Sequence, residues 1–222
     1  MSGVLSGKII FISGGTGTLG RKIVKECLRC GARVLFSYCS GEKAASSLAS
    51  AGGEPFSLEL TDRRQIRALP KRLAEHVPRL DVLINNAAAV MDKTLVSLSE
   101  EAWDRVLAVN LTGTVFLTQA LLPFLYKSGS GKILSVGSRV GLHGAYGQGN
   151  YAASKGGLIA FTKTLAKEVG DKGIEVNILH PGFMESAMTR DLSESVHAMN
   201  RDKSCFGTLC DPLAVARFVA YY

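Results

Sequence analysis

The sequence of 222 residues has little of what marks membrane, disulfide-stabilised or metal-binding proteins. It has no uninterrupted apolar run of about 18 residues, the length that a membrane-spanning helix needs, and residues 1–8 lack the architecture of a signal peptide. Its five cysteines include one pair in Cys-x-x-Cys spacing, Cys27 and Cys30, but no second pair or histidine cluster completes a metal site. We therefore expect free structural thiols, no metal and a cytoplasmic protein.

The formal net charge is +7 and the sequence pI is about 9.2. Such a balance suits an anionic partner or cofactor. The basic residues are scattered and are not interleaved with aromatic residues, so we expect no nucleic-acid binding and no membrane binding. The length, with no repeat, linker or low-complexity segment, predicts a single domain over residues 1–222.

Short apolar runs alternate with longer amphipathic segments. Pro70 falls within one of these segments and is expected to kink or interrupt it. The expected strands are 8–13, 33–38, 56–60, 82–85, 132–136 and 175–180. The expected helices are 19–30, 42–51, 63–76, one that begins at Glu100, a resumed helical stretch over 111–126, 151–169 and 212–222. This alternation predicts an α/β fold, a single-domain Rossmann-type doubly wound parallel sheet with helices on both faces. Ligands of such sheets bind at the carboxyl ends of the strands.

A glycine-rich turn, Ser13-Gly14-Gly15-Thr16-Gly17-Thr18-Leu19-Gly20, links the first strand to the first helix. Glycine lets the backbone approach a pyrophosphate closely, and a helix N-terminus favours negative charge. The alternative is an ordinary tight turn, but four glycines exceed what a turn needs. The pattern predicts cofactor contacts from Gly14, Thr16, Gly17, Leu19 and Gly20.

The second strand ends in Ser37-Tyr38-Cys39-Ser40. NAD-selective sites of this fold place an acid here to bind the ribose hydroxyls, and the first acid is Glu42. Ser37 and Ser40, with Lys43 nearby, suit a 2′-phosphate instead. The sequence favours NADP(H) and leaves NAD(H) open as the alternative. After the fourth strand, Asn85-Asn86-Ala87-Ala88 offers small residues, and we expect Asn86, Ala87 and Ala88 to lie against the cofactor.

Tyr151 and Lys155 are four residues apart on an expected helix and therefore share one face. A close cation favours the phenolate and lowers the pKa of tyrosine. In a carbonyl reduction Tyr151 would donate the proton, Lys155 would lower its pKa and bind the nicotinamide ribose, Ser138 would orient the carbonyl, and Asn110 would position a water or backbone group that relays protons to Lys155. Each residue alone has an ordinary structural explanation, but their combination with the glycine-rich turn favours catalysis.

On these motifs, together with Pro181-Gly182, the chain resembles the short-chain dehydrogenase/reductase family from residue 8 to residue 222. The segments Tyr151–Lys163, 166–169 and 181–189 are most similar to 3-oxoacyl-acyl-carrier-protein reductases. The resemblance implies catalytic Asn110, Ser138, Tyr151 and Lys155. It implies cofactor contacts from the turn, from Asn86 and Ala87, from Tyr151 and Lys155, and from Pro181 and Gly182 beside the nicotinamide.

The resemblance also implies a substrate, the 3-oxo group of an acyl-carrier-protein thioester. A small ketone or secondary alcohol, and a non-catalytic NAD(P)-sensing or scaffold protein, remain alternatives. Lys172 occupies a place where a basic residue faces the acidic carrier, and Lys127 and Lys132 would extend that patch, although three solvated lysines would look the same. A homo-oligomer, dimer or tetramer, is expected.

Three departures from the family pattern stand out. Thr18 replaces a motif glycine, and the turn lacks the usual arginine or lysine that grips a 2′-phosphate. Ala88 replaces a further glycine. The family's last strand would follow residue 222 and is absent from the sequence given. Residues 185–210 are the expected substrate lid.

Overall fold

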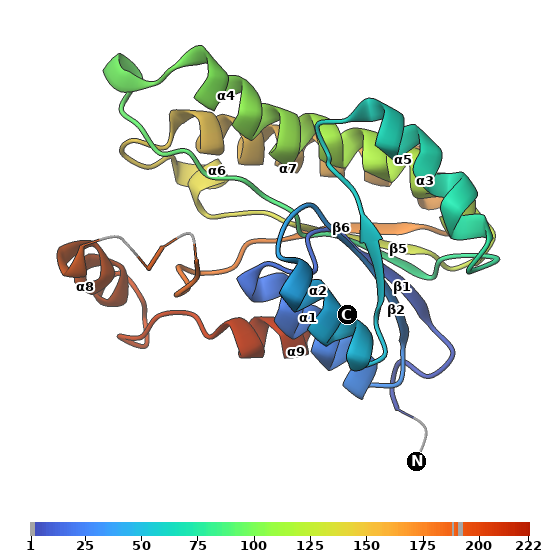
Figure 1. Ribbon diagram of the computed structural model, residues 1–222. Coiled ribbons are helices and arrows are strands. Elements are labelled where there is room, and N and C mark those ends of the chain that lie inside the picture. Colours follow the sequence, from blue (N-terminus) through green and yellow to red (C-terminus); the bar gives the residue numbers. More distant parts are fainter. Residues whose placement is uncertain (1–2, 188, 191–192) are drawn as a thin grey trace.

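In the computed structural model, which describes residues 3–187, 189–190 and 193–222, six parallel strands form one sheet in the order β3-β2-β1-β4-β5-β6 (Figure 1). The strands are β1 (Ile9–Ile12), β2 (Arg33–Tyr38), β3 (Glu54–Ser57), β4 (Val82–Asn85), β5 (Lys132–Val136) and β6 (Glu175–Leu179). The strand order runs outward from β1 to β3 on one side and from β4 to β6 on the other. This reversal of strand order between β1 and β4 is the topology of a doubly wound Rossmann-type sheet, as the sequence predicts.

Helices cover both faces of the sheet. The α-helices are α1 (Thr18–Arg29), α2 (Glu42–Ser50), α3 (Arg63–Ala74), α4 (Glu100–Leu107), α5 (Thr114–Tyr126), α6 (Val140–His143), α7 (Gly149–Val169), α8 (Glu194–Asp202) and α9 (Pro212–Tyr221). Short turns of other helical types are η1 (Leu95–Ser97), η2 (Ala108–Gly113) and η3 (Gly170–Lys172). Figure 1 shows α1, α2 and α9 on one face and α3, α4, α5 and α7 on the other.

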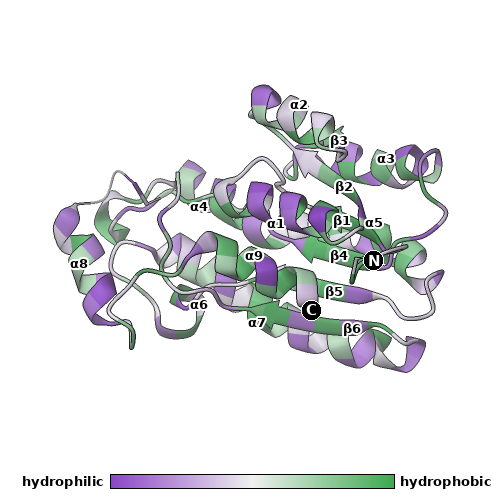
Figure 2. Cartoon of the chain, turned by 90° about the horizontal axis from the view of Figure 1, so that it is seen from below, coloured by the Kyte–Doolittle hydropathy of each residue, from purple (hydrophilic) through white to green (hydrophobic). Residues whose placement is uncertain are grey.

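Successive side chains of β1 enter two different cores, because a strand presents alternate residues to opposite faces. Phe11 packs with Leu69 and Leu121 of one helical layer, whereas Ile12 packs with Ile23 of the other. Strands covered on both faces are apolar along their whole length, and Figure 2 shows the central strands as mainly hydrophobic. Burial of these two cores fixes the strands whose carboxyl ends carry the site.

Local signals account for most element boundaries. Asp62 caps α3 by accepting hydrogen bonds from the backbone nitrogens of Arg64 and Gln65, and Ser99 caps α4. Two expectations need correction. Pro70 does not interrupt α3, which continues to Ala74. The third strand lies at Glu54–Ser57 rather than at 56–60, because it is a sheet edge paired with β2 from Leu35 opposite Glu54, and only Phe56 of its residues is buried and apolar.

The helical stretch Glu100–Tyr126 is long and apolar enough to cross a membrane by length and composition, although the sequence has no uninterrupted apolar run of that length. Its apolar residues have partners inside the protein. Leu117, Leu121 and Leu125 are fully buried and pack in the core on one face of the sheet. Their burial accounts for the apolar composition of this helix.

Candidate active site

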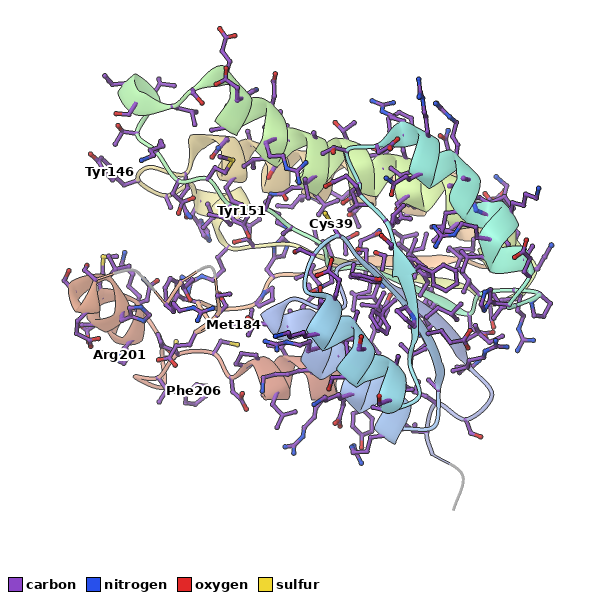
Figure 3. All side chains as sticks on the ribbon, in the orientation of Figure 1. Cys39, Tyr146, Tyr151, Met184, Arg201 and Phe206 are labelled. Atoms are coloured by element: carbon purple, nitrogen blue, oxygen red, sulfur yellow. The ribbon has the colours of Figure 1, made fainter. Side chains whose placement is uncertain are left out.

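A cleft of about 460 Å³ lies at the carboxyl ends of the strands. It is lined by residues that follow β1, β2, β3, β4, β5 and β6, and by the first turns of α7. Every residue predicted to contact the cofactor lines this cleft, and so do Ser138, Tyr151 and Lys155. Asn110 is buried beneath it. Figure 3 labels three residues that reach this region from separate elements, Tyr151, Cys39 and Met184.

The glycine-rich turn lines the cleft, and two of its glycines lie where a side chain would collide with neighbouring backbone. Gly14 has φ +67°, and a Cβ there would lie 2.8 Å from the Cα of Ala87. A Cβ on Gly20 would lie 2.2 Å from the carbonyl oxygen of Gly14. The turn therefore approaches both the neighbouring strand and its own helix as closely as glycine allows.

Asn86 holds this turn in place. Its Nδ2 donates hydrogen bonds of 3.0 Å to the carbonyl oxygens of both Ser13 and Gly14. In return, the Ser13 hydroxyl oxygen accepts hydrogen bonds from the backbone nitrogens of Asn86 and Ala87. The side chain that was expected to face the cofactor thus also ties β4 to the turn after β1.

The residues after β2 differ in part from the expectation. Ser37 is 2% exposed, and its hydroxyl oxygen accepts a hydrogen bond from the backbone nitrogen of Gly14. The Ser40 carbonyl accepts a hydrogen bond of 2.9 Å from the Thr16 hydroxyl, which joins the two loops. Lys43, on α2, is exposed and does not line the cleft. Thr18, at the position of the displaced glycine, accepts a hydrogen bond from the backbone nitrogen of Ala187 and so contacts the expected lid.

Tyr151 and Lys155 lie on one face of α7, which begins at Gly149, two residues before the expected start. Lys155 is 2% exposed. Its Nζ donates a hydrogen bond of 2.7 Å to the carbonyl oxygen of Val136 and lies 5.8 Å from the centre of the Tyr151 ring. Burial lowers the pKa of Lys155 to about 8.

The pKa of Tyr151 moves in the direction opposite to the one expected. Burial raises it, a hydrogen bond with Ser138 opposes that change, and the charge of Asp92 raises it further. The predicted lowering by Lys155 is therefore wrong for this arrangement, because desolvation of the half-buried phenol dominates. A raised pKa keeps the phenol protonated, which is the state that a proton donor needs.

Ser138 follows the carboxyl end of β5 and is held from two sides. Its hydroxyl oxygen accepts a hydrogen bond of 3.1 Å from the backbone nitrogen of Val140. Its carbonyl oxygen lies 3.1 Å from Nδ1 of His180, which comes directly after β6. A Cβ on Gly137 would lie 2.6 Å from the same imidazole nitrogen, so the ring packs against a position that glycine leaves open.

Asn110 lies in the π-helical turn η2 and is completely buried. Its Oδ1 accepts a hydrogen bond of 2.7 Å from the backbone nitrogen of Ala89, and its Nδ2 donates to the Ala89 carbonyl and to the Ser154 hydroxyl. Single π-helical turns inside helices occur frequently at functional sites. The side chain joins the loop after β4 to the residue preceding Lys155.

Several cleft residues have no recognisable signal in the sequence. Asp92 accepts a hydrogen bond of 2.6 Å from Gln148, and burial raises the pKa of its carboxyl group. Glu59 and Arg105 form an ion pair of 3.0 Å across 46 positions of sequence. This ion pair cannot be predicted from a local sequence motif, because only the fold brings the end of β3 beside α4.

The expected carrier patch lies away from the cleft of its own chain. Lys132 begins β5, whereas Ser138 follows the carboxyl end of that strand. The Nζ atom of Lys132 forms an ion pair of 3.0 Å with Glu175 and donates a hydrogen bond to the carbonyl oxygen of Tyr222. Lys172 follows the last turn of α7 and donates to the Glu168 carbonyl. These lysines are therefore at the opposite end of the sheet from Tyr151.

The two ends of the expected lid segment are joined by a hydrogen bond from the Cys210 backbone nitrogen to the Phe183 carbonyl oxygen. His197 of α8 packs edge-on against Phe183, with ring centres 5.5 Å apart. Met188, Asp191 and Leu192 of this segment lie outside the described residues.

The cysteines are free thiols throughout the part of the chain that the structure describes. Cys27 and Cys30 are both buried in or next to α1, and burial raises the pKa of Cys27 to about 12. Within the described residues, no group of three or more His, Cys, Asp or Glu side chains is arranged to hold a metal ion.

A doubly wound sheet, a glycine cradle for a pyrophosphate, and a serine, tyrosine and lysine at one cleft together define a nicotinamide-dependent oxidoreductase. A family model described as short chain dehydrogenase matches residues 8–197, and the chain belongs to this family. The predicted resemblance is thereby confirmed.

Known relatives include two proteins named 3-oxoacyl-[acyl-carrier-protein] reductase FabG. That of Thermotoga maritima is 37% identical over 222 residues, covering 98% of this chain and 90% of the relative. That of Escherichia coli is 35% identical over 217 residues, covering 97% and 89%. Among solved structures, the Pseudomonas aeruginosa RhlG/NADP active-site complex matches with a TM-score of 0.88 and 28% identity, covering 97% of this chain and 90% of that one.

Proposed function

We propose that the protein reduces the 3-oxo group of an acyl-carrier-protein thioester with NADP(H), and that Tyr151 donates the proton. The observation that carries this proposal is that Ser138, Tyr151 and the buried Lys155 line one cleft together with the glycine-rich turn. The substrate rests on similarity to relatives with that named activity, at 35 to 37% identity over nearly the whole chain. The structure of the RhlG/NADP complex supports the choice of cofactor.

The nicotinamide cofactor, when bound, supplies the hydride that reaches the carbonyl carbon. The protein's own residues position the carbonyl group and deliver the proton to its oxygen. Ser138 donates a hydrogen bond to the carbonyl oxygen and fixes its position, and the Tyr151 hydroxyl gives its proton to that oxygen as the alcohol forms. Lys155, whose pKa is lowered to about 8 by burial, is a stronger acid than a solvated lysine and can return a proton to the phenolate. The Val136 carbonyl holds its Nζ in place.

We also propose that the carrier docks near Lys172 in a homo-oligomer. Tyr151 lies near the start of α7 and Lys172 just beyond its end, and the 18-residue separation between Tyr151 and Val169 spans about 27 Å at the helical rise. A carrier bound at Lys172 is therefore better placed to serve the cleft of an adjoining subunit than that of its own. The oligomeric state itself stays a prediction.

Replacement of Tyr151 by Phe tests the proton donor. We expect kcat for NADPH oxidation with acetoacetyl-acyl-carrier protein to fall by about 10²-fold or more, because general acid catalysis contributes that much. Equilibrium binding of NADPH should persist. Tyr146→Phe is a matched control, since this tyrosine is 93% exposed and does not line the cleft. Activity that survives Tyr151→Phe would remove Tyr151 from the mechanism.

A second candidate function is reduction of a small ketone or oxidation of a secondary alcohol without a carrier. Val140, Phe183 and Met184 give the cleft apolar walls that require no carrier for binding. A steady-state comparison of acetoacetyl-carrier protein with simple ketones, using NADPH and NADH in parallel, separates the two. Lack of activity toward the thioester, with turnover of a ketone, would favour this second candidate.

A further inference from the structure

A chain of three polar side chains lies where β2 and β3 end. The Cys39 thiol, directly after β2, donates to Oε2 of Glu59 at 3.0 Å. The same carboxylate oxygen accepts a hydrogen bond of 3.0 Å from Nη2 of Arg105, which comes from α4. All three residues line the cleft.

Arg105 and Lys155 are the two cations that line the cleft among the described residues. Lys155 is buried at the catalytic end and bonded to Val136. Arg105 retains 45% side-chain exposure. Its guanidinium is therefore the positive group that a ligand bound at the carboxyl ends of β2 and β3 would meet.

The end of β2 is where this fold distinguishes a free ribose 2′-hydroxyl from a 2′-phosphate, through an acid in the first case and an arginine in the second. Here the glycine-rich turn has no cation, and Lys43 does not line the cleft. We propose that Arg105, reaching across from α4, binds the 2′-phosphate and selects NADP(H) over NAD(H). This inference rests on the proposed function, since it concerns the cofactor of that reaction.

An anionic ligand can bind beside Glu59 only if a cation such as Arg105 neutralises the charge of the Glu59 carboxylate. Burial raises the pKa of the Glu59 carboxyl, but hydrogen bonds from Cys39, Thr61 and Arg105 outweigh it and lower the pKa to about 2, so the group is a carboxylate. Unpaired, that charge would repel a phosphate bound beside Cys39. Arginine suits the position because its planar fork can serve a carboxylate and a phosphate at once.

The pair can adapt to a ligand because neither partner is fully buried. Glu59 retains 26% side-chain exposure, and the Arg105 Nη1 donates a hydrogen bond of 3.1 Å to the Thr61 hydroxyl. A modest rotation of the long arginine side chain would keep one contact with Glu59 and turn the remaining donors toward the phosphate.

Equilibrium binding of two cofactor fragments tests the inference without any catalytic step. The probes are 2′,5′-ADP and 5′-AMP, which differ in the 2′-phosphate, measured by isothermal titration calorimetry. We expect Arg105→Met to weaken 2′,5′-ADP by about tenfold or more, the value of a charge-assisted hydrogen bond, and to change 5′-AMP by less than about twofold. Retained 5′-AMP binding also shows that the variant is folded.

Arg64→Met is the matched control, because Arg64 is exposed on α3, does not line the cleft and carries the same charge. It should leave both affinities unchanged. Glu59→Gln should strengthen 2′,5′-ADP binding, and the double variant should recover part of the loss caused by Arg105→Met. Equal weakening of both fragments by Arg105→Met, or no effect on either, would overturn the inference. Neither result depends on which carbonyl is reduced.

Discussion

The Nζ atom of Lys155 donates a hydrogen bond of 2.7 Å to the carbonyl oxygen of Val136, the last residue of β5. The lysine comes from α7, so this bond fastens the catalytic helix to the carboxyl end of β5, two residues before Ser138. It is the only hydrogen bond that the ammonium makes among the described residues, and the side chain is 2% exposed. A charge in such a place costs stability, and that cost depends on pH.

Lys155 should make the stability of the protein rise between pH 8 and pH 10.5. Burial lowers its pKa from the ordinary 10.5 to about 8 in the folded state. In that window the unfolded chain binds the proton and the folded chain does not, so the free energy of unfolding increases with pH. The change amounts to about 3 kcal/mol at most.

Urea unfolding of the wild type and of Lys155→Met, at several pH values from 7 to 10.5, measures this effect. Met keeps most of the volume and removes the charge. The difference in unfolding free energy between the two proteins should shift in favour of the wild type as pH rises. A difference that stays constant over this range would contradict the lowered pKa.

Asn110 should contribute more to stability than its partner Ser154. Replacement by Leu removes the partner of both the nitrogen and the carbonyl of Ala89 in a partly buried loop, at a cost of about 1–3 kcal/mol. Ser154→Ala removes one of the three bonds to Asn110 and leaves the clamp on Ala89 intact. Chemical denaturation of both variants checks the order, and an equal loss for the two would argue against the clamp.

Two glycines of the same turn should tolerate alanine very differently. A Cβ on Gly20 meets the Gly14 carbonyl at 2.2 Å, so Gly20→Ala should destabilise the fold by about 1–3 kcal/mol and weaken dinucleotide binding. A Cβ on Gly17 has its nearest neighbour at 3.5 Å, and φ there is −67°. Gly17→Ala should cost less than about 1 kcal/mol. Thermal unfolding and NADPH titration of both variants decide the matter.

His180 should act as a positioning residue for Ser138. Loss of the contact between Nδ1 and the Ser138 carbonyl frees the loop after β5, so His180→Leu should lower kcat by about tenfold or more while KM for NADPH stays near its original value. Asn can place an amide N–H where the Nδ1–H lies, and His180→Asn should recover much of the rate. A matching rise in KM, or failure of Asn to restore any rate, would point to a general disturbance of the fold.

The sheet was predictable because its strands are covered on both faces and are therefore continuously apolar. Expected strands at 82–85 and 132–136 match β4 and β5. The edge strand β3 was placed two residues too late, since Glu54 and Pro55 carry no apolar signal there. Within the expected lid, α8 was not foreseen, although its sequence is amphipathic at the helical period.

The cleft was predictable to the extent that its residues belong to short motifs. Tyr151, Lys155 and the turn carry their chemistry in local spacing. The bond from His180 to Ser138 and the pair of Glu59 with Arg105 depend on segments 42 and 46 positions apart, and no local pattern encodes them. The direction of the Tyr151 pKa was equally hidden, because it depends on how much water the folded cleft removes from the phenol.

The clamp that Asn86 places on the carbonyl oxygens of Ser13 and Gly14 has a consequence for how a ligand is received. Glycine-rich backbone loses more conformational entropy than any other when it becomes ordered. In this protein the turn loses its conformational entropy when the chain folds and not when a ligand binds, because Asn86, directly after β4, already restrains the turn before a ligand enters the cleft. Association of a dinucleotide should then proceed with little reorganisation of the turn, and variants of Asn86 should transfer the entropy cost from folding to binding.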